Sequence, residues 1–244
     1  MKNIMLKVSY DGTNYSGWQI QENAITVEEK ITEAIYLLTG ERVKVIGSGR
    51  TDKGVHAYKQ VCNFKTKSKI SPSKFYYHLK KYLPDDIDVF YSKEVDMDFN
   101  SRFSAKSKTY IYKIMNTEYM SPIYRNYYAQ IDYKLDFQKM KEASSEFIGR
   151  KDFTSFTKAL EENINPVRNI LDLSLYKKDK IIYIKITGES FLRNMVRIIA
   201  GCLVEVGRGK IKKEEIPLIF AKKNRKYAGP TLTGSGLYLF DVKY

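Results

Sequence analysis

The sequence predicts an α+β fold in which two halves of similar strand and helix order share a mixed, mostly antiparallel sheet. Three observations lead to this prediction. Hydrophobic residues make up 43% of the 244 residues, enough for a sizeable core. Segments that alternate between polar and apolar residues are interrupted by segments of helical periodicity, in an order that nearly repeats. No stretch rich in Gly or Ser separates the halves, which favours one continuous sheet.

The first half has the order β-α-β-β-α-β, which is that of a ferredoxin-like (split βαβ) unit. Its first helix is predicted to follow Thr26, which can form a capping box with Glu29, and to end at Gly40. The second helix is predicted between Ser71 and Pro84, because proline cannot continue a helix. Strands are predicted at residues 3–9, 43–49, 58–66 and 88–95.

The second half nearly repeats this order of elements, without a matching repeat in the sequence itself. Strands are predicted at residues 108–115, 124–131, 169–176, 181–187 and 236–243, and helices at 136–148 and 190–206. The last helix is apolar on almost every side, so we expect it to be buried. Arg193 and Arg197 are exceptions one turn apart. A buried guanidinium group needs an acidic partner or a cleft, because an unpaired interior charge is costly. Alternatively, both side chains extend to water from the end of the helix.

The boundary between the halves is predicted where polar residues replace the apolar pattern, which gives domains 1–104 and 105–244. The net charge of +14 is divided unevenly between them. The first domain has 16 Lys and Arg against 13 Asp and Glu, and the second has 26 against 15. We therefore expect the second domain to bind a polyanion. Twenty Tyr and twelve Phe suit RNA with unpaired bases, although core aromatics and surface lysines would give the same composition.

A glycine-rich loop between two predicted strands, from Gly47 to Ala57, is a candidate active-site loop. Its sequence is GSGRTDKGVHA, and its glycines permit positive φ and close approach of another molecule to the backbone. Arg50 and Asp52 are expected at its tip. The alternative is an ordinary hairpin turn, in which Asp, Lys and Gly are common. An ion pair between Asp52 and Arg197 would join the two halves at a central active-site cleft.

Other features of the composition exclude several classes of protein. Cys62 and Cys202 are far apart and lack the spacing of a disulfide framework or a zinc site, and two histidines are too few for most metal sites. The N-terminus has no apolar stretch of signal-peptide length, and no segment approaches the length of a membrane span. We therefore expect a cytoplasmic protein with no membrane partner.

The loop sequence from Gly47 to Ala57, continued by Gln60, Val61 and Phe64, resembles the signature of the TruA-type tRNA pseudouridine synthases. Four further groups of residues occur in the order of that family. They are Tyr10–Thr13 with Gly17–Gln19, Phe103–Ala105 with Lys108–Tyr112, Phe191–Arg197, and Gly236–Leu239. Five motifs in order, spanning essentially the whole chain, are far more specific than a lone Arg-Thr-Asp.

The resemblance implies that the protein isomerises uridine to pseudouridine at positions 38 to 40 of the tRNA anticodon stem-loop, as a homodimer without cofactor or metal. The reaction breaks the bond from ribose C1′ to uracil N1 and forms one to C5, with no redox change. It requires an ionised carboxylate, whether this attacks C1′, adds to C6 or acts as a base. A target base inside a stem must first be flipped out.

The resemblance also implies a role for each of five residues. Asp52 matches the catalytic aspartate of the family. Arg50 matches the arginine that helps to hold the target nucleotide out of the helix, and Tyr110 the tyrosine that stacks on the target base. Arg197 matches the basic residue that pairs with the aspartate. Leu237 lies where the family packs an apolar residue against the pocket.

The sequence departs from the family pattern in the segment 228–235, which is longer and richer in glycine. Arg193 and Asn194 stand at positions that vary in the family and receive no transferred role, and His56 is expected to order the loop.

Three alternatives to the enzyme remain at the level of the sequence. They are an RNA-binding or RNA-folding protein without catalysis, a pseudouridine synthase of other RNA positions, and an RNA-recognition-motif protein. Retention of Arg50, Asp52 and Tyr110 together favours the enzyme. The RNA-recognition motif follows from the β-α-β-β-α-β order alone, and the chain lacks the expected Lys/Arg-Gly-Phe/Tyr run.

Overall fold

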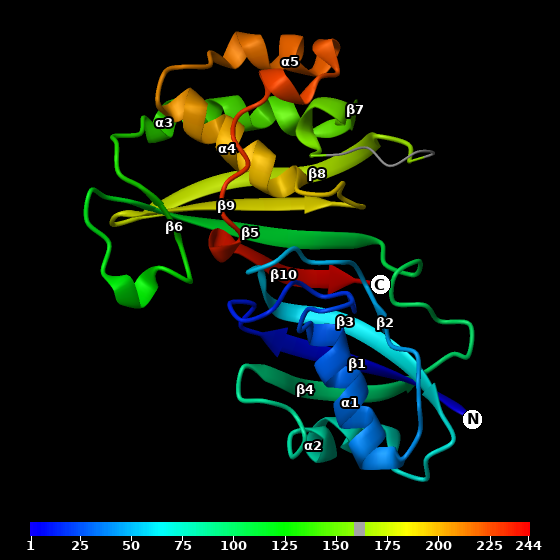
Figure 1. Ribbon diagram of the computed structural model, residues 1–244. Helices are drawn as coiled ribbons and strands as arrows, with labels where there is room; N and C mark the ends of the chain where they lie inside the picture. The colour runs from blue at the N-terminus through cyan, green and yellow to red at the C-terminus, as the bar shows by residue number, and fades with distance from the viewer. Residues whose placement is uncertain (159–163) are drawn as a thin grey trace. The chain divides into compact units, whose positions relative to one another are not determined.

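The computed structural model describes residues 1–158 and 164–244, and the chain forms two compact units (Figure 1). Met1–Lys106 and Tyr238–Tyr244 make up the first unit, and Ser107–Leu237 the second. Each unit has a mostly antiparallel sheet with helices, so the predicted α+β class is confirmed. The division differs from 1–104 and 105–244 at the C-terminus, because the last strand pairs with a strand of the first unit.

The sheet of the first unit is mixed, with the strand order β4-β1-β3-β10. Its strands are β1 (Lys2–Tyr10), β2 (Ile46–Gly47), β3 (His56–Thr66), β4 (Ile87–Val95) and β10 (Leu237–Lys243). Strand β1 is antiparallel to both β3 and β4, and β2 is antiparallel to β3. Strand β10 runs parallel to β3, with Tyr238 opposite His56.

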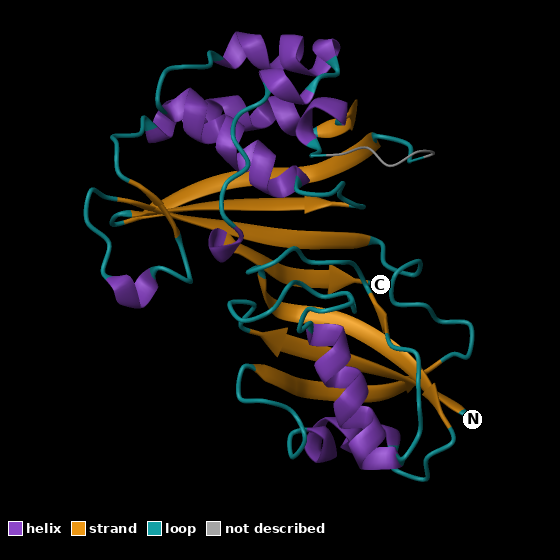
Figure 2. Ribbon diagram, viewed as in Figure 1, coloured by secondary structure: helices purple, strands orange, loops and turns teal. Residues whose placement is uncertain are grey.

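Helix α1 (Val27–Thr39) packs on one face of this sheet (Figure 2). Its predicted ends are confirmed: Thr26 and Glu29 form the capping box, and Gly40 ends the helix at φ 72°. Such a positive φ suits glycine because it has no Cβ. Helix α2 (Phe75–Leu79) is shorter than predicted, since the chain leaves it by a tight turn in which Tyr82 N donates to Leu79 O.

The sheet of the second unit has the order β5-β9-β8-β7, in which all neighbours are antiparallel. Its strands are β5 (Ser107–Asn116), β6 (Ala129–Ile131), β7 (Gly149–Asp152), β8 (Val167–Lys178) and β9 (Ile181–Gly188). Strand β6 runs parallel to β5. It is shorter than predicted because a 3₁₀ turn, Pro122–Tyr124, continues into a further turn over residues 125–127, at the start of the predicted segment. Strand β7 was not predicted, since its four residues carry no apolar alternation.

Three α-helices lie in the described part of the second unit: α3 (Phe137–Ala143), α4 (Met195–Gly207) and α5 (Ile216–Lys222). Helix α4 has eleven buried residues among thirteen, so its predicted burial is confirmed. Its predicted start at residue 190 is wrong, because Asn194 adopts the left-handed φ of 62° and the helix begins only at the next residue. Arg193 therefore precedes the helix as an exposed residue and does not lie one helical turn before Arg197.

No helix in the described residues combines the length and apolar character needed to cross a membrane.

Candidate functional site

The candidate loop joins β2 to β3 in the first unit and holds Asp52 half-buried, with Arg50 exposed beside it. Two backbone hydrogen bonds define its turn. Val55 N donates to Asp52 O at 3.2 Å, and Gly54 N donates to Tyr15 O at 3.3 Å. Gly54 has a φ of 73°, which a side chain would strain. The predicted placement of the two charged residues in one tight loop is thus observed within this unit.

The loop is held by close approach of the backbone of residues 12–18. Trp18 N donates to Thr51 O at 3.1 Å. A Cβ at Gly17 would lie 2.3 Å from Thr51 O, and a Cβ at Gly12 would lie 2.0 Å from Val55 O. Real Cβ atoms do not approach an oxygen so closely, so any other residue at either position would push the two backbones apart.

Buried side chains fix the backbone immediately before Asp52. The Tyr10 hydroxyl and Thr51 Oγ1 are hydrogen-bonded at 2.9 Å. Ser48 Oγ donates to Gln60 Oε1 at 2.6 Å, and Gln60 Nε2 donates to Gly49 O at 2.9 Å. The polar groups are therefore satisfied inside the protein, where an unpaired one would cost about 1–3 kcal/mol. No role was predicted for these side chains from the sequence. The local signal is Gln60 itself, a polar residue directly before the apolar pair Val61 and Cys62.

The buried ring of His56 ties this loop to the preceding segment and to β10. Its Nδ1 accepts a hydrogen bond from Gly12 N at 3.1 Å, and its ring stacks on Tyr238 with centroids 4.7 Å apart. The contacts support the ordering role expected for His56.

Arg50 lies near an acidic group at the start of α1. Burial raises the pKa of Glu28, and the positive charges of Arg50 and Lys44, together with a hydrogen bond from Ile20 N at 3.1 Å, partly offset this effect. The base of the loop thus contains charges of both signs, and Arg50 is exposed to a ligand.

The second unit holds Tyr110, Arg197 and Leu237. Tyr110 lies on β5, is 7% exposed, and packs edge-to-face against Phe191 with centroids 5.1 Å apart. This contact fixes the plane of the ring. Leu237 is 6% exposed and is the last residue of the unit.

Arg197 projects from α4 and contacts the glycine-rich segment 228–235, which crosses that helix (Figure 1). Its Nε donates to Leu232 O at 2.7 Å. The crossing is close because a Cβ at Gly201 would lie 1.9 Å from Pro230 O. The glycines in this part of the chain therefore allow the segment to lie directly on the helix.

The far end of the same segment is fixed to β5. The Tyr112 hydroxyl donates to Thr233 O at 2.8 Å. Burial raises the pKa of Tyr112, against the opposing effects of this hydrogen bond and of the charge on Arg197. The segment 228–235 thus connects α4 to β5 and leads directly to Leu237.

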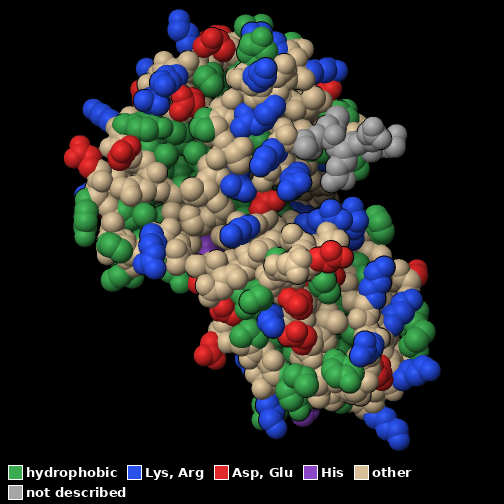
Figure 3. All heavy atoms as spheres, viewed as in Figure 1, with side chains coloured by type: hydrophobic (Ala, Val, Ile, Leu, Met, Phe, Trp, Pro, Cys, Tyr) green, Lys and Arg blue, Asp and Glu red, His purple; other side chains and the backbone are tan. Residues whose placement is uncertain are grey.

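The electrostatic character of the second unit agrees with the polyanion surface that was expected. Figure 3 shows Lys and Arg side chains gathered over and beside α4. Such a surface attracts phosphate groups.

Comparisons with known proteins point to one family. A family model described as tRNA pseudouridine synthase matches residues 7–104 and 143–244. Proteins named tRNA pseudouridine synthase A from Acetivibrio thermocellus, Thermoanaerobacter pseudethanolicus and Caldicellulosiruptor saccharolyticus are 49%, 47% and 48% identical to the chain, respectively. Each alignment covers 100% of both chains.

Replacement of Gly17 by alanine tests the close approach of the two backbones. Gly17 and Gly40 both have a positive φ, but a Cβ at Gly40 would meet nothing within 4 Å. We expect Gly40→Ala to lower the free energy of unfolding by about 1 kcal/mol through backbone strain alone. Gly17→Ala should lower it by about 3 kcal/mol or more, because overpacking adds to the strain. Urea unfolding measures the free energy of unfolding of both variants. Equal decreases would contradict the prediction, because they would show that the loop moves to accept the added methyl group at no energetic cost.

Proposed function

The chain belongs to the tRNA pseudouridine synthase family, and we propose that it converts uridine to pseudouridine at positions 38 to 40 of the tRNA anticodon stem-loop. The family makes it an isomerase that acts on tRNA uridine. The observation that supports the proposal best is the half-buried Asp52, held in a loop whose backbone is fixed on both sides.

Asp52 supplies the carboxylate that the reaction needs. The bond from C1′ to N1 breaks and one from C1′ to C5 forms, while a proton leaves C5 and N1 gains one, so atoms and electrons balance within the substrate. The catalytic group must therefore be aimed at the nucleotide and kept there. The hydrogen bonds at Thr51 and Val55 hold the chain around Asp52 in place. Such positioning lowers the barrier because less orientational freedom is lost in the transition state.

The remaining four residues bind the flipped nucleotide. Flipping a base out of a stem costs about a few kcal/mol, which stacking on an aromatic ring can offset. Tyr110 provides that ring, held in its plane by Phe191. Arg50 is exposed and holds the nucleotide out of the stem. Arg197 supplies positive charge at the pocket, and Leu237 an apolar wall.

The partner is tRNA, whose phosphates bind the basic surface of the second unit, and the activity belongs in the cytoplasm where tRNA is processed. The homodimer that the resemblance implies is also part of the proposal. Light scattering would then give a mass about twice 28.4 kDa, and a mass of 28.4 kDa would contradict it.

Substitution of Asp52 tests the assignment of the catalytic group. We expect Asp52→Ala to lower the rate of pseudouridine formation by about 10³-fold or more, because the reacting carboxylate is lost. Binding of tRNA should change little. A pseudouridine map of an unmodified tRNA transcript, together with a binding titration, measures both effects.

The matched control is Asp85→Ala, which removes an exposed carboxylate from the same unit and should leave both measurements unchanged. Activity retained by Asp52→Ala would contradict the assignment. A wild-type map with pseudouridine only outside positions 38 to 40 would contradict the proposed substrate position but not the catalytic residue.

A further inference from the structure

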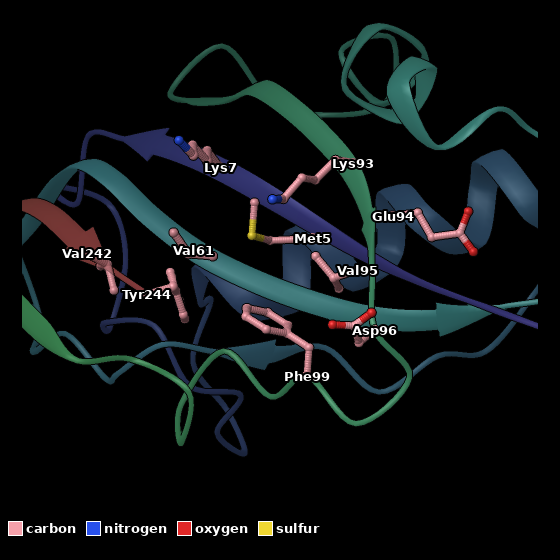
Figure 4. A pocket seen from close by; sticks show the side chains of 10 residues that line it. All are labelled: Met5, Lys7, Val61, Lys93, Glu94, Val95, Asp96, Phe99, Val242 and Tyr244. Atoms are coloured by element: carbon pink, nitrogen blue, oxygen red, sulfur yellow. The ribbon is translucent and has the colours of Figure 1, made fainter.

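The sheet of the first unit has a second face, opposite α1, that no helix of this unit covers in the described residues. Alternation along β1 separates the two faces. Ile4, Leu6 and Val8 are fully buried on the side of α1, and Met5 and Lys7 project from the other side. Figure 4 shows the latter pair with side chains of neighbouring strands. We call this surface the open face.

A hollow of about 480 Å³ lies on the open face (Figure 4). Met5, Val61 and Val242 form an apolar floor. Phe99 and Tyr244 form one wall, with ring centroids 5.1 Å apart and planes inclined at 50°. The volume falls in the range of sites for small ligands, and an apolar floor with aromatic walls suits a flat ring.

Two lysines border the hollow on adjacent strands. The register of β1 and β4 places Lys7 opposite Tyr91 and Met5 opposite Lys93. Lys7 Nζ lies 5.0 Å from the centroid of the Tyr91 ring, which is 41% exposed. In Figure 4 the amino groups of Lys7 and Lys93 point in a similar direction. Together they present positive charge beside an exposed aromatic ring.

Acidic residues also border the hollow, but away from the lysines. Figure 4 shows Glu94 directed away from both amino groups, and Asp96 at the Phe99 end. The hollow therefore has a basic end at the two lysines and an aromatic end that also carries Asp96.

Further aromatic rings are exposed where the open face reaches β10. Phe240 shares a face with Val242 through the alternation of that strand, and Tyr58 lies with it, its ring 6.0 Å from that of Phe240. Tyr58 is 43% exposed and Phe240 37%. Exposed aromatic rings thus lie on both sides of the hollow, and the Tyr58 ring itself stacks on Tyr238 with centroids 5.3 Å apart.

We propose that the open face binds single-stranded RNA, with an unpaired base in the hollow and adjacent phosphates at Lys7 and Lys93. Exposed aromatic side chains on a four-stranded sheet bind RNA in other folds, where unpaired bases stack on them. Lysines beside the rings neutralise the backbone. The site is distinct from the Asp52 loop, which contacts the segment leading into α1.

A second copy of the chain fits this face less well. In a two-fold interface the same patch meets itself, so both copies of each lysine would enter one interface. Like charges brought together in this way disfavour the contact.

The test uses a fluorescent hexa-adenylate RNA, which has no stem and no uridine and so cannot be a substrate. Fluorescence anisotropy with the full chain gives the affinity over a range of salt concentrations. We expect the double variant Lys7→Ala/Lys93→Ala to bind about 10-fold or more weakly, and the log–log salt slope to fall by about 1.4, as for two phosphates of a single strand. Tyr91→Ala should weaken binding and leave the slope unchanged.

The matched control is Lys67→Ala/Lys69→Ala, which removes two exposed lysines of the same unit outside the hollow. It should change the affinity less than twofold. Equal losses in the two double variants, or no loss in the first, would overturn the proposal. If the Lys7→Ala/Lys93→Ala variant has a lower mass in solution than the wild type but binds RNA equally well, the open face is a protein interface and the proposal is overturned.

Measurement of pseudouridine formation at saturating tRNA separates this proposal from the proposed function. We expect the Lys7→Ala/Lys93→Ala variant to keep the wild-type turnover rate and thermal midpoint. Loss of turnover with unchanged binding of hexa-adenylate would contradict a separate binding role for the open face.

Discussion

The central constraint in this structure is the direct contact of two backbones in the first unit, with no side chain between them. Gly12 and Gly17 allow residues 12–18 to lie against the loop that carries Asp52. The loop turn, the hydrogen bond at Thr51 O and the packing of His56 all depend on this approach. A carboxylate that must meet one atom of a nucleotide gains from such a fixed backbone, because each degree of freedom removed beforehand lowers the cost of the transition state.

The second unit also contains a close backbone contact at glycines, here between a helix and the segment that crosses it. Gly201 and Gly229 let the segment 228–235 lie on α4, where Arg197 contacts its backbone. In both units, close packing at glycine therefore lies beside a charged side chain proposed to meet the substrate. The segment 228–235, which departs from the family pattern, has a structural reason to contain Gly229. A side chain at this position would hold the segment away from α4.

The elements that follow from local rules were predicted well, and those that depend on distant contacts were not. The capping box at Thr26 and the alternation in β1 and β9 are local, so α1 and both strands lie where expected. The start of α4 was misplaced because a single left-handed residue, Asn194, overrides an apolar pattern that continues through it. The bond from Tyr10 to Thr51 spans 41 residues and has no sequence periodicity to reveal it. Among the candidate residues, Arg50 and Asp52 followed from the glycine-rich loop and Arg197 from its apolar helix, whereas Tyr110 and Leu237 came only from the resemblance to a family.

The most direct test of the account is the single-turnover rate of pseudouridine formation by Tyr10→Phe at saturating tRNA. This substitution keeps the ring and leaves Asp52 unchanged, but removes the hydroxyl that holds Thr51. If the fixed loop makes the carboxylate effective, the rate should fall about 10-fold while tRNA affinity stays the same, since a lost buried hydrogen bond is worth about 1–3 kcal/mol. A wild-type rate in this variant would contradict the claim that the clamped backbone serves catalysis.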